Sequence, residues 1–175
     1  TPRLHAAGQY DAAAKRFTLT LTQTLAPTAY EARLREAGLP VEDGPLHMPV
    51  AVGLVLPDGS DALIEKTQVL SLTESTQTFI FDDIPAAPVV SLLRDFSAPV
   101  QLDFEQTDTE LAHLMAHDSD AFNRWEAGQR LFLRLLTQLA RKAAAGETLG
   151  LPAVVAAAFK RILADRTLDP AFKAE

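Results

Sequence analysis

The chain has 175 residues, of which 47% are hydrophobic, 16 are Lys or Arg, 23 are Asp or Glu and none is Cys. This composition is typical of a globular protein with a buried core, and the missing cysteines exclude disulfides, thiolate metal sites and a cysteine nucleophile. No apolar run approaches the roughly 20 residues of a membrane-spanning helix, and no basic stripe suits nucleic acid. We therefore expect neither a membrane nor a nucleic acid as partner, and the cysteine-free sequence favours a reducing compartment, the cytoplasm.

The acidic charge is concentrated in the first part of the chain. Residues 1–105 hold 7 basic and 14 acidic side chains, whereas residues 106–175 hold nine of each. The simplest interpretation of the acidic part is a well-solvated surface.

The first hundred residues alternate apolar and polar side chains with the period of two that is typical of half-buried strands. About seven strands are predicted, at 15–24, 48–56, 62–65, 67–72, 76–82, 89–94 and 100–105. Short strands separated by turns predict an antiparallel, immunoglobulin-like β-sandwich over residues 1–104. The residues expected in its core are Phe17, Leu19, Val50, Val52, Phe79, Phe81, Leu92, Val100 and Leu102.

A long connection at 26–46 separates the first two predicted strands. It contains Pro27, Gly38, Pro40 and Pro45, and a short helix is predicted at 30–37. A connection of this length is expected to be either an exposed excursion or a crossover between two sheets.

The period changes to that of helices after Glu105, so we predict that residues 105–175 form an α-helical segment. Thr107 and Glu110 have the spacing of a capping box, which starts a first helix. A second helix is predicted from Asp118 or Ser119 to about residue 145, where Gly146 ends it. A third follows Pro152 and ends near residue 165.

The apolar residues of the two later helices predict which faces are buried. Five residues of the second helix are predicted to line one side: Phe122, Trp125, Phe132, Leu136 and Leu139. Leu131, Leu133 and Leu135 add apolar surface around the rest of that helix, and Trp125 is interpreted as a core residue. The inward residues of the third helix are predicted to be Val155, Ala158, Phe159 and Ile162.

Asp169-Pro170 is a helix-start signal only a few residues before Glu175, and the chain begins at Thr1 rather than at Met. We therefore expect the chain to be a piece of a longer protein. Helices that lack their neighbours would leave apolar side chains uncovered and would favour self-association. The residues expected to be exposed in this way are Leu131, Leu133, Leu135, Val154 and Phe172.

His113 and His117 are the strongest metal-ligand candidates because they are four residues apart on a predicted helix. This is the spacing with which zinc proteases hold their metal. However, Leu114 replaces the glutamate that would act as general base, and Leu136 occupies the place of the third ligand. Two partly exposed histidines on an amphipathic helix are the simpler interpretation.

No other pattern predicts catalysis. Ser91 and Ser97 have no nucleophile-elbow glycines around them, and the paired carboxylates Glu42-Asp43 and Asp82-Asp83 fall in loops or strand ends. The pairs Arg94–Asp95 and Arg124–Asp120 are predicted to be exposed ion pairs, worth roughly 0.2–1 kcal/mol each. We therefore assign no catalytic, cofactor-binding or metal-binding residue, and we expect that the chain alone is not an enzyme.

Several segments together resemble the bacterial aminopeptidase N family of zinc-dependent aminopeptidases. They are L-H-M-P-V at 46–50, Q-T-F-I-F-D at 77–82, S-L-L-R-D-F-S-A-P-V at 91–100, L-M-A-H-D at 114–118, F-N-R-W-E at 122–126 and L-P at 151–152. The resemblance covers nearly the whole chain, and F-S-A-P-V beside R-W-E is its most specific part.

The resemblance implies a position after the catalytic domain. Residues to about 104 would be the small β-sandwich domain of such an enzyme, and the remainder would begin its helical C-terminal domain. The family's zinc motif HExxH and its exopeptidase motif GxMEN do not occur in this sequence. The implied role is therefore a non-catalytic one, in which the chain bridges the catalytic domain and a helical cap, with zinc bound outside the segment.

Two other interpretations remain open on the sequence alone. The first is a free-standing β-sandwich interaction module that carries a helical appendage. The second is a minimal zinc hydrolase built on His113 and His117, and the missing glutamate and third ligand argue against it.

Overall fold

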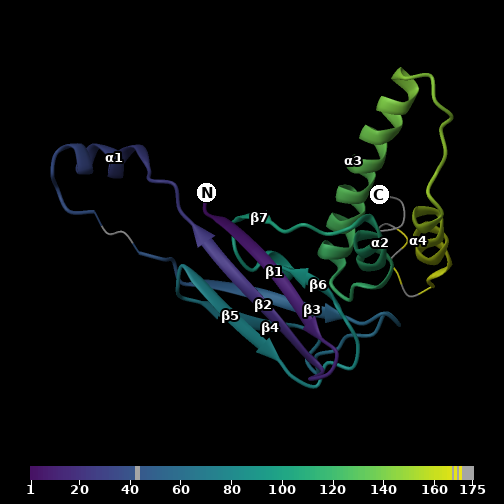
Figure 1. Ribbon diagram of the computed structural model, residues 1–175, viewed down its shortest axis with the longest axis horizontal. Helices are drawn as coiled ribbons and strands as arrows, with labels where there is room; N and C mark the ends of the chain where they lie inside the picture. Colours follow the sequence, from purple (N-terminus) through teal and green to yellow (C-terminus); the bar gives the residue numbers. More distant parts are fainter. Residues whose placement is uncertain (42–43, 167, 169, 171–175) are drawn as a thin grey trace.

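The computed structural model describes residues 1–41, 44–166, 168 and 170, which form a two-sheet sandwich followed by a layer of helices (Figure 1). One sheet has the order β5-β2-β1-β7, with strands Thr76–Phe81, Arg16–Thr24, Arg3–Asp11 and Gln101–Asp103. The other has the order β4-β3-β6, with strands Gln68–Leu72, Met48–Val55 and Val89–Leu92. The predicted fold, an immunoglobulin-like sandwich followed by helices, is confirmed.

One strand pair differs from the antiparallel prediction. β1 and β7 run parallel over Arg3–His5, because β7 enters the sheet beside the start of β1 after the chain has passed through the second sheet. The other strand pairs of the two sheets are antiparallel. The first sheet is therefore mixed.

One predicted strand is wrong and one real strand was missed. Residues 62–65 form turns, with Ile64 almost fully exposed, and only Asp61 makes an isolated bridge to Val55. β1 was missed because it buries little: Leu4 and Ala6 are its only buried side chains, so its alternation is faint in the sequence. Its nine-residue pairing with β2, rather than its own pattern, makes it a strand.

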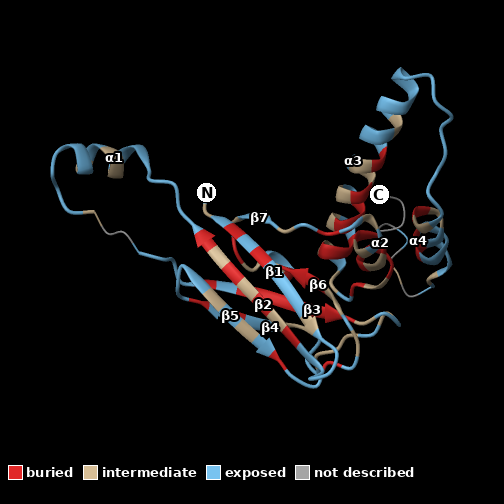
Figure 2. Ribbon diagram, viewed as in Figure 1, coloured by how far each residue is buried: buried red, intermediate tan, exposed pale blue. Residues whose placement is uncertain are grey.

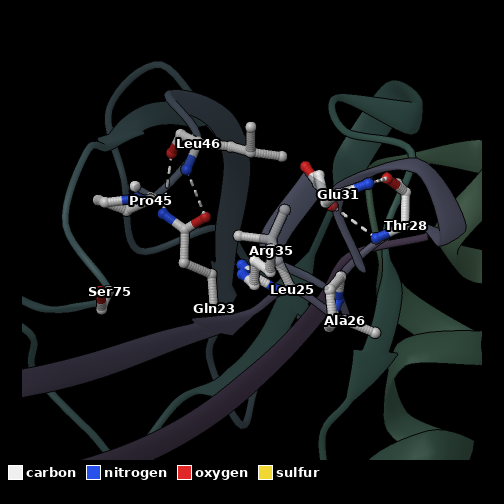
Figure 3. A pocket seen from close by; sticks show the side chains of 11 residues that line it. Gln23, Leu25, Ala26, Thr28, Glu31, Arg35, Pro45, Leu46 and Ser75 are labelled. Carbon is white, nitrogen blue, oxygen red and sulfur yellow. Dashed lines mark hydrogen bonds between the residues drawn. The ribbon is translucent and has the colours of Figure 1, made fainter. Parts of the chain in front are cut away.

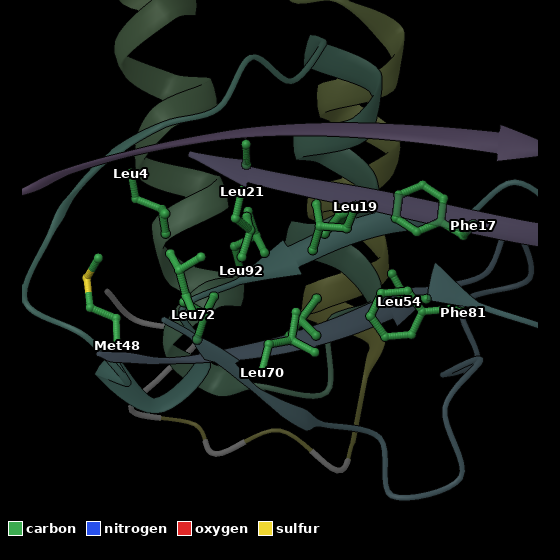
Figure 4. Close-up of a cluster of buried hydrophobic side chains, with 14 of the residues drawn as sticks. Leu4, Phe17, Leu19, Leu21, Met48, Leu54, Leu70, Leu72, Phe81 and Leu92 are labelled. Carbon is green, nitrogen blue, oxygen red and sulfur yellow. The ribbon is translucent and has the colours of Figure 1, made fainter. Parts of the chain in front are cut away.

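The core between the sheets follows the predicted alternation (Figure 4). On β2, Phe17, Leu19 and Leu21 are buried, while Thr20 and Thr22 lie on the other face and hydrogen-bond to Thr78 and Thr76 of β5. Phe17, Leu19, Val50, Val52, Phe81 and Leu92 are buried as predicted. The other three predicted core residues, Phe79, Val100 and Leu102, are only partly buried at the margin of the same cluster.

The connection from β2 to β3 is both an excursion and a crossover. It leaves one sheet and returns in the other, and it carries the short helix α1, Ala29–Glu36, away from the sandwich (Figure 2). No residue of α1 is buried. The helix is instead held by a complete capping box between Thr28 and Glu31, which satisfies amides that packing leaves exposed to water.

Within the described residues, three longer helices follow the sandwich: α2 (Asp108–His117), α3 (Ala121–Ala144) and α4 (Ala153–Ala164). The predicted capping box of Thr107 and Glu110 starts α2. α3 begins later than predicted because Asp120, not Asp118 or Ser119, caps it, through a 2.8 Å bond from the Asn123 amide. None of the described helices is long and apolar enough to cross a membrane.

The buried face of α3 differs from the predicted one. Ala127, Gly128, Leu131 and Leu135 point inward, and a β-carbon added at Gly128 would make an ordinary 3.6 Å contact with the Met115 side chain of α2. This side of α3 belongs to the helical core that α2 and α4 also form. Trp125 and Leu136, predicted to be inward, are therefore exposed.

The orientation of α3 also corrects the prediction of which apolar side chains of the helices are exposed. Leu131 and Leu135 are buried in the helical core, so their predicted exposure was wrong, whereas Leu133 is exposed as predicted. Val154 is partly buried, and Phe159 on α4 is exposed on one side and stacks on Phe132 with the other. Phe172 and the predicted helix start at Asp169 lie outside the described residues.

Two leucines on α3 provide a matched test of this packing. Leu131 is 1% exposed and Leu133 is 69% exposed. We expect Leu131→Ala to lower the free energy of unfolding by roughly 2–5 kcal/mol because it leaves a cavity. Leu133→Ala should change it by less than about 0.5 kcal/mol. Urea denaturation of both variants checks this. Equal losses of stability would contradict the burial of Leu131 and the exposure of Leu133.

Candidate functional site

A buried arginine lies where the sandwich meets the helices. Arg94 belongs to the short 3₁₀ turn η1 (Arg94–Phe96) and is 1% exposed. Its guanidinium lies against Gly53 of β3, where a β-carbon would be 1.9 Å from Arg94 Cζ. Any side chain larger than glycine at this position would displace the arginine.

Hydrogen bonds satisfy all three guanidinium nitrogens of Arg94. Nη2 donates to Asp118 Oδ1 at 2.8 Å and lies 3.3 Å from Asp61 Oδ1. Nη1 donates to the Lys66 carbonyl at 2.8 Å and to Thr67 Oγ1 at 3.1 Å, and Nε donates to Ser91 Oγ at 3.0 Å. Asp118 is the residue that ends α2, so this side chain links the two halves of the chain. The predicted exposed Arg94–Asp95 pair is wrong.

The carboxylate of Asp118 is fully buried. Burial raises its pKa, while the positive charge of Arg94 acts in the opposite direction. Oδ1 accepts from both Arg94 and the Asp120 amide, whereas Oδ2 has no hydrogen-bond partner among the described residues. Without Arg94, this carboxylate would be a buried charge with no counter-ion.

We call Arg94, Asp118 and the hydrogen bonds around them the junction between the sandwich and the helices. Further polar contacts extend this junction along α3. Asn123 Nδ2 donates to Ser91 Oγ and to the Leu92 carbonyl, at 2.7 Å each. Arg124 donates to the carbonyls of Met115 and Ala116, which end α2 and have no partner within that helix. The predicted Arg124–Asp120 pair is therefore wrong: Arg124 is buried and its carboxylate neighbour is Asp165, at 3.7 Å.

The short segment between β7 and α2 is also fixed. Gln106 is buried and donates to the Val90 carbonyl at 3.0 Å. Arg130 donates to Gln106 Oε1 and to the Phe104 carbonyl, and Arg134 donates to the Gln106 carbonyl. Two arginines of α3 thus hold the connecting backbone, and the sandwich and α3 are joined without a free linker.

His113 and His117 stack on each other with ring centroids 4.7 Å apart. His113 Nε2 lies 2.8 Å from the Leu56 carbonyl, so that nitrogen carries the hydrogen, and His117 packs against Gly59. Burial, together with the nearby charge of Arg161, lowers the pKa of His117 to about 4. Among the described residues no three His, Asp or Glu side chains gather as a metal site. The pair fits a packing role between α2 and the sandwich better than a zinc site.

A hollow of about 360 Å³ lies at the root of the α1 excursion (Figure 3). The buried side chain of Gln23 forms one wall and bonds both backbone groups of Leu46, at 2.9 and 2.8 Å, as well as the Glu74 carbonyl. Glu31 in the same hollow is held by the α1 capping box. Among the described residues that line the hollow, Ser75 and the capping Thr28 carry the hydroxyl groups.

Breaking the junction gives a measurable stability loss. We expect Arg94→Met to lower the free energy of unfolding by roughly 3–5 kcal/mol because Asp118 is left buried and unpaired. Arg94→Met combined with Asp118→Leu should cost less than the sum of the single changes. The exposed pair Arg16–Asp82, at 2.7 Å, is the control: Arg16→Met should leave the free energy of unfolding nearly unchanged. If the losses of the two single variants simply add in the double variant, Arg94 and Asp118 do not stabilise each other directly.

The lowered pKa of His117 predicts a pH dependence of stability. Between pH 6.5 and about 4 the unfolded chain binds a proton at this imidazole that the folded chain does not. The free energy of unfolding should therefore fall as the pH is lowered through this window. His117→Gln should flatten that slope, and the exposed His5 provides the control variant His5→Gln. A His117 ring that titrates near 6.5 by NMR in the folded chain would contradict this.

Two family models together match nearly all of the chain. Residues 1–105 match one described as a domain of unknown function (DUF3458) with an Ig-like fold, and residues 108–175 match DUF3458_C, described as ARM repeats. By structure, the chain resembles Legionella pneumophila aminopeptidase A, crystallised in complex with aspartic acid, with a TM-score of 0.76 over 99% of this chain and 18% of that one. At 24% identity this likeness shows the fold alone.

Three curated relatives carry the name Aminopeptidase N. The Escherichia coli K12 protein is 34% identical over the whole chain, the Caulobacter vibrioides protein 40% over 71% of it, and the Haemophilus influenzae protein 31% over 93%. The matched parts are 20%, 14% and 18% of those proteins, so the chain spans about a fifth of their length or less. The chain therefore belongs to the DUF3458 family, and its predicted resemblance to a segment of bacterial aminopeptidase N is confirmed.

Proposed function

We propose that the chain is a non-catalytic part of a zinc-dependent aminopeptidase that removes N-terminal residues from peptides. In this proposal it fixes the position of a helical cap relative to the catalytic domain. The observation that carries the proposal is the buried pair of Arg94 and Asp118, which ties the last part of the sandwich to the end of α2. A scaffold needs this kind of rigid contact, whereas a flexible linker does not.

Two further features support a scaffold. The similarity to aminopeptidase N runs through both halves of the chain, so the two halves occur together in the relatives. The segment between β7 and α2 is only four residues long, and two arginines of α3 hold its backbone. The orientation of the helices on the sandwich is thereby set by buried contacts at several points.

The partners in this proposal are the other domains of the same protein, with zinc bound in one of them. The ARM-repeat description of residues 108–175 supports such neighbours, because each repeat buries its apolar surface against the next one. Leu133 and Leu136 on α3 and Leu163 on α4 are exposed and would be covered in this way. In isolation the same surface would favour self-association of the chain. The cytoplasm, expected from the cysteine-free sequence, is the proposed compartment.

The first test uses the isolated chain. We expect no hydrolysis of alanyl or leucyl amides above background, with or without added zinc, because the chain supplies no general base beside a metal-bound water. The measurement is release of the chromogenic amine over a range of zinc concentrations. Activity that co-purifies with the chain and is lost in His113→Ala would contradict the proposal.

The second test uses the complete protein. A junction variant, Arg94→Met, should lower the midpoint of thermal inactivation, because loss of the buried ion pair destabilises the part of the complete protein that this chain forms. At 25 °C its kcat and KM for a small amide should stay within about twofold of the unaltered enzyme. Arg16→Met is the matched control. A tenfold loss of kcat with an unchanged midpoint would assign the junction to catalysis rather than to scaffolding.

A further inference from the structure

β5 lies at one edge of the four-stranded sheet, and no described strand pairs with its outer side (Figure 1). Its pairing with β2 fixes which backbone groups face outward. The Gln23 amide of β2 donates to the Ser75 carbonyl at 2.8 Å, so the odd-numbered residues of β5 bond to β2. The even-numbered residues therefore direct their N–H and C=O groups away from the sheet: Thr76, Thr78 and Ile80.

These outward groups, which we call the β5 edge, are open to water. Thr76, Thr78 and Ile80 are all exposed, and no described residue hydrogen-bonds to their backbone on the outer side. Each of the three residues offers one donor and one acceptor. Such a row of unpaired backbone groups is a template for another extended strand, because only an extended backbone matches its spacing.

The β5 edge lacks the features with which proteins usually prevent edge strands from pairing. Residues 75–81, S-T-Q-T-F-I-F, contain no charge, no proline and no glycine, and they favour an extended backbone. The edge strand β6 of the other sheet is different. Gln106 donates to the Val90 carbonyl, and Asn123 donates to the Leu92 carbonyl. Side chains thus occupy backbone groups of β6, whereas those of the β5 edge stay open.

A second copy of β5 is complementary to this edge. In an antiparallel pair with a twofold axis at Phe79, Thr78 of each copy lies opposite Ile80 of the other. Both residues then direct their donors and acceptors at the partner strand. The same register places Asp82 opposite Thr76, so no two carboxylates face each other across the pair. The uncharged, β-branched side chains of Thr78 and Ile80 also pair well across strands.

We propose that the β5 edge is a pairing surface for a second copy of the chain, which joins the two four-stranded sheets into one continuous sheet. The inference is independent of the proposed function, because it uses no other domain of the complete protein. The contact involves few residues of each copy and is smaller than a standard protein–protein interface. The dimer is therefore weak and forms at high protein concentration.

Hydrogen exchange at single amides tests the pairing. In the monomer the amides of Thr78 and Ile80 face water, whereas the amide of Phe79 bonds to β2. We expect exchange at Thr78 and Ile80, measured by NMR, to slow at least about tenfold as sedimentation shows the dimer to form. Exchange at Phe79 should be slow throughout. Unchanged exchange at Thr78 and Ile80, or a chain that is monomeric at every concentration used for NMR, would overturn the proposal.

Two variants of the β5 edge test the same contact. Thr78→Pro removes an outward N–H but no bond to β2, and proline is tolerated on the open side of an edge strand. It should weaken the dimer at least about tenfold, because the symmetric contact loses a hydrogen bond in each copy. Ile80→Lys keeps every backbone group and should weaken the dimer as well, because it brings two positive charges close together.

A helical variant tests the competing site of association. Leu133 lies on the exposed surface of α3, so Leu133→Ala should change the dissociation constant of this dimer by less than about twofold. A dimer that is weakened by Leu133→Ala and not by Thr78→Pro or Ile80→Lys would place self-association on the helices. That result would overturn pairing through the β5 edge.

The complete protein tests a different occupant of the edge. We expect the segment 76–81 of the dilute complete protein to contain rapidly exchanging amides, measured by mass spectrometry, because no second copy is bound. Slow exchange of the whole segment at every concentration would mean that another part of the same protein covers the β5 edge. This outcome would overturn pairing between copies, and it leaves the test of amide hydrolysis by the isolated chain unaffected.

Discussion

The burial of one guanidinium constrains more of this structure than any other single contact. Arg94 must find several acceptors away from water, and it finds them on β6, on the turn after Asp61 and on the end of α2. Each of these segments is thereby placed relative to the others. Gly53 has to lack a side chain, Asp118 cannot serve as the cap of α3, and η1 has to adopt positive φ angles. A charge that is costly to bury therefore sets the geometry between the two halves of the chain.

The parts of the fold that the sequence predicted are those set by local pattern. β2, β3 and the capping box at Thr107 depend on neighbours in sequence, and each was found within a residue or two of its predicted position. β1 was not predictable in this way, because only Leu4 and Ala6 of its side chains are buried and its apolar alternation is therefore faint. The face of α3 was also mispredicted, since apolar residues surround that helix and its sequence does not show which side packs against α2.

The junction could not have been found from sequence spacing. Arg94 and Asp118 are 24 residues apart and belong to different halves of the chain, whereas Arg94 and Asp95 are adjacent and look like a surface pair. The burial of an arginine is difficult to predict from sequence, because arginine is more often exposed. The one available sign was Gly53 within an otherwise continuous β3 strand, since glycine inside a strand often marks the close approach of another group.

The side chain of Gln23 has a consequence for how this fold can vary. Its amide bonds both backbone groups of Leu46, much as a neighbouring strand would, and so joins the two ends of the excursion that carries α1. Residues between these ends can be added or removed without moving β2 or β3, because lengthening a closed loop adds little entropy cost. The length of the α1 excursion can thus change at little cost to the sandwich. An inserted tag or reporter at this position would leave the core and the junction intact.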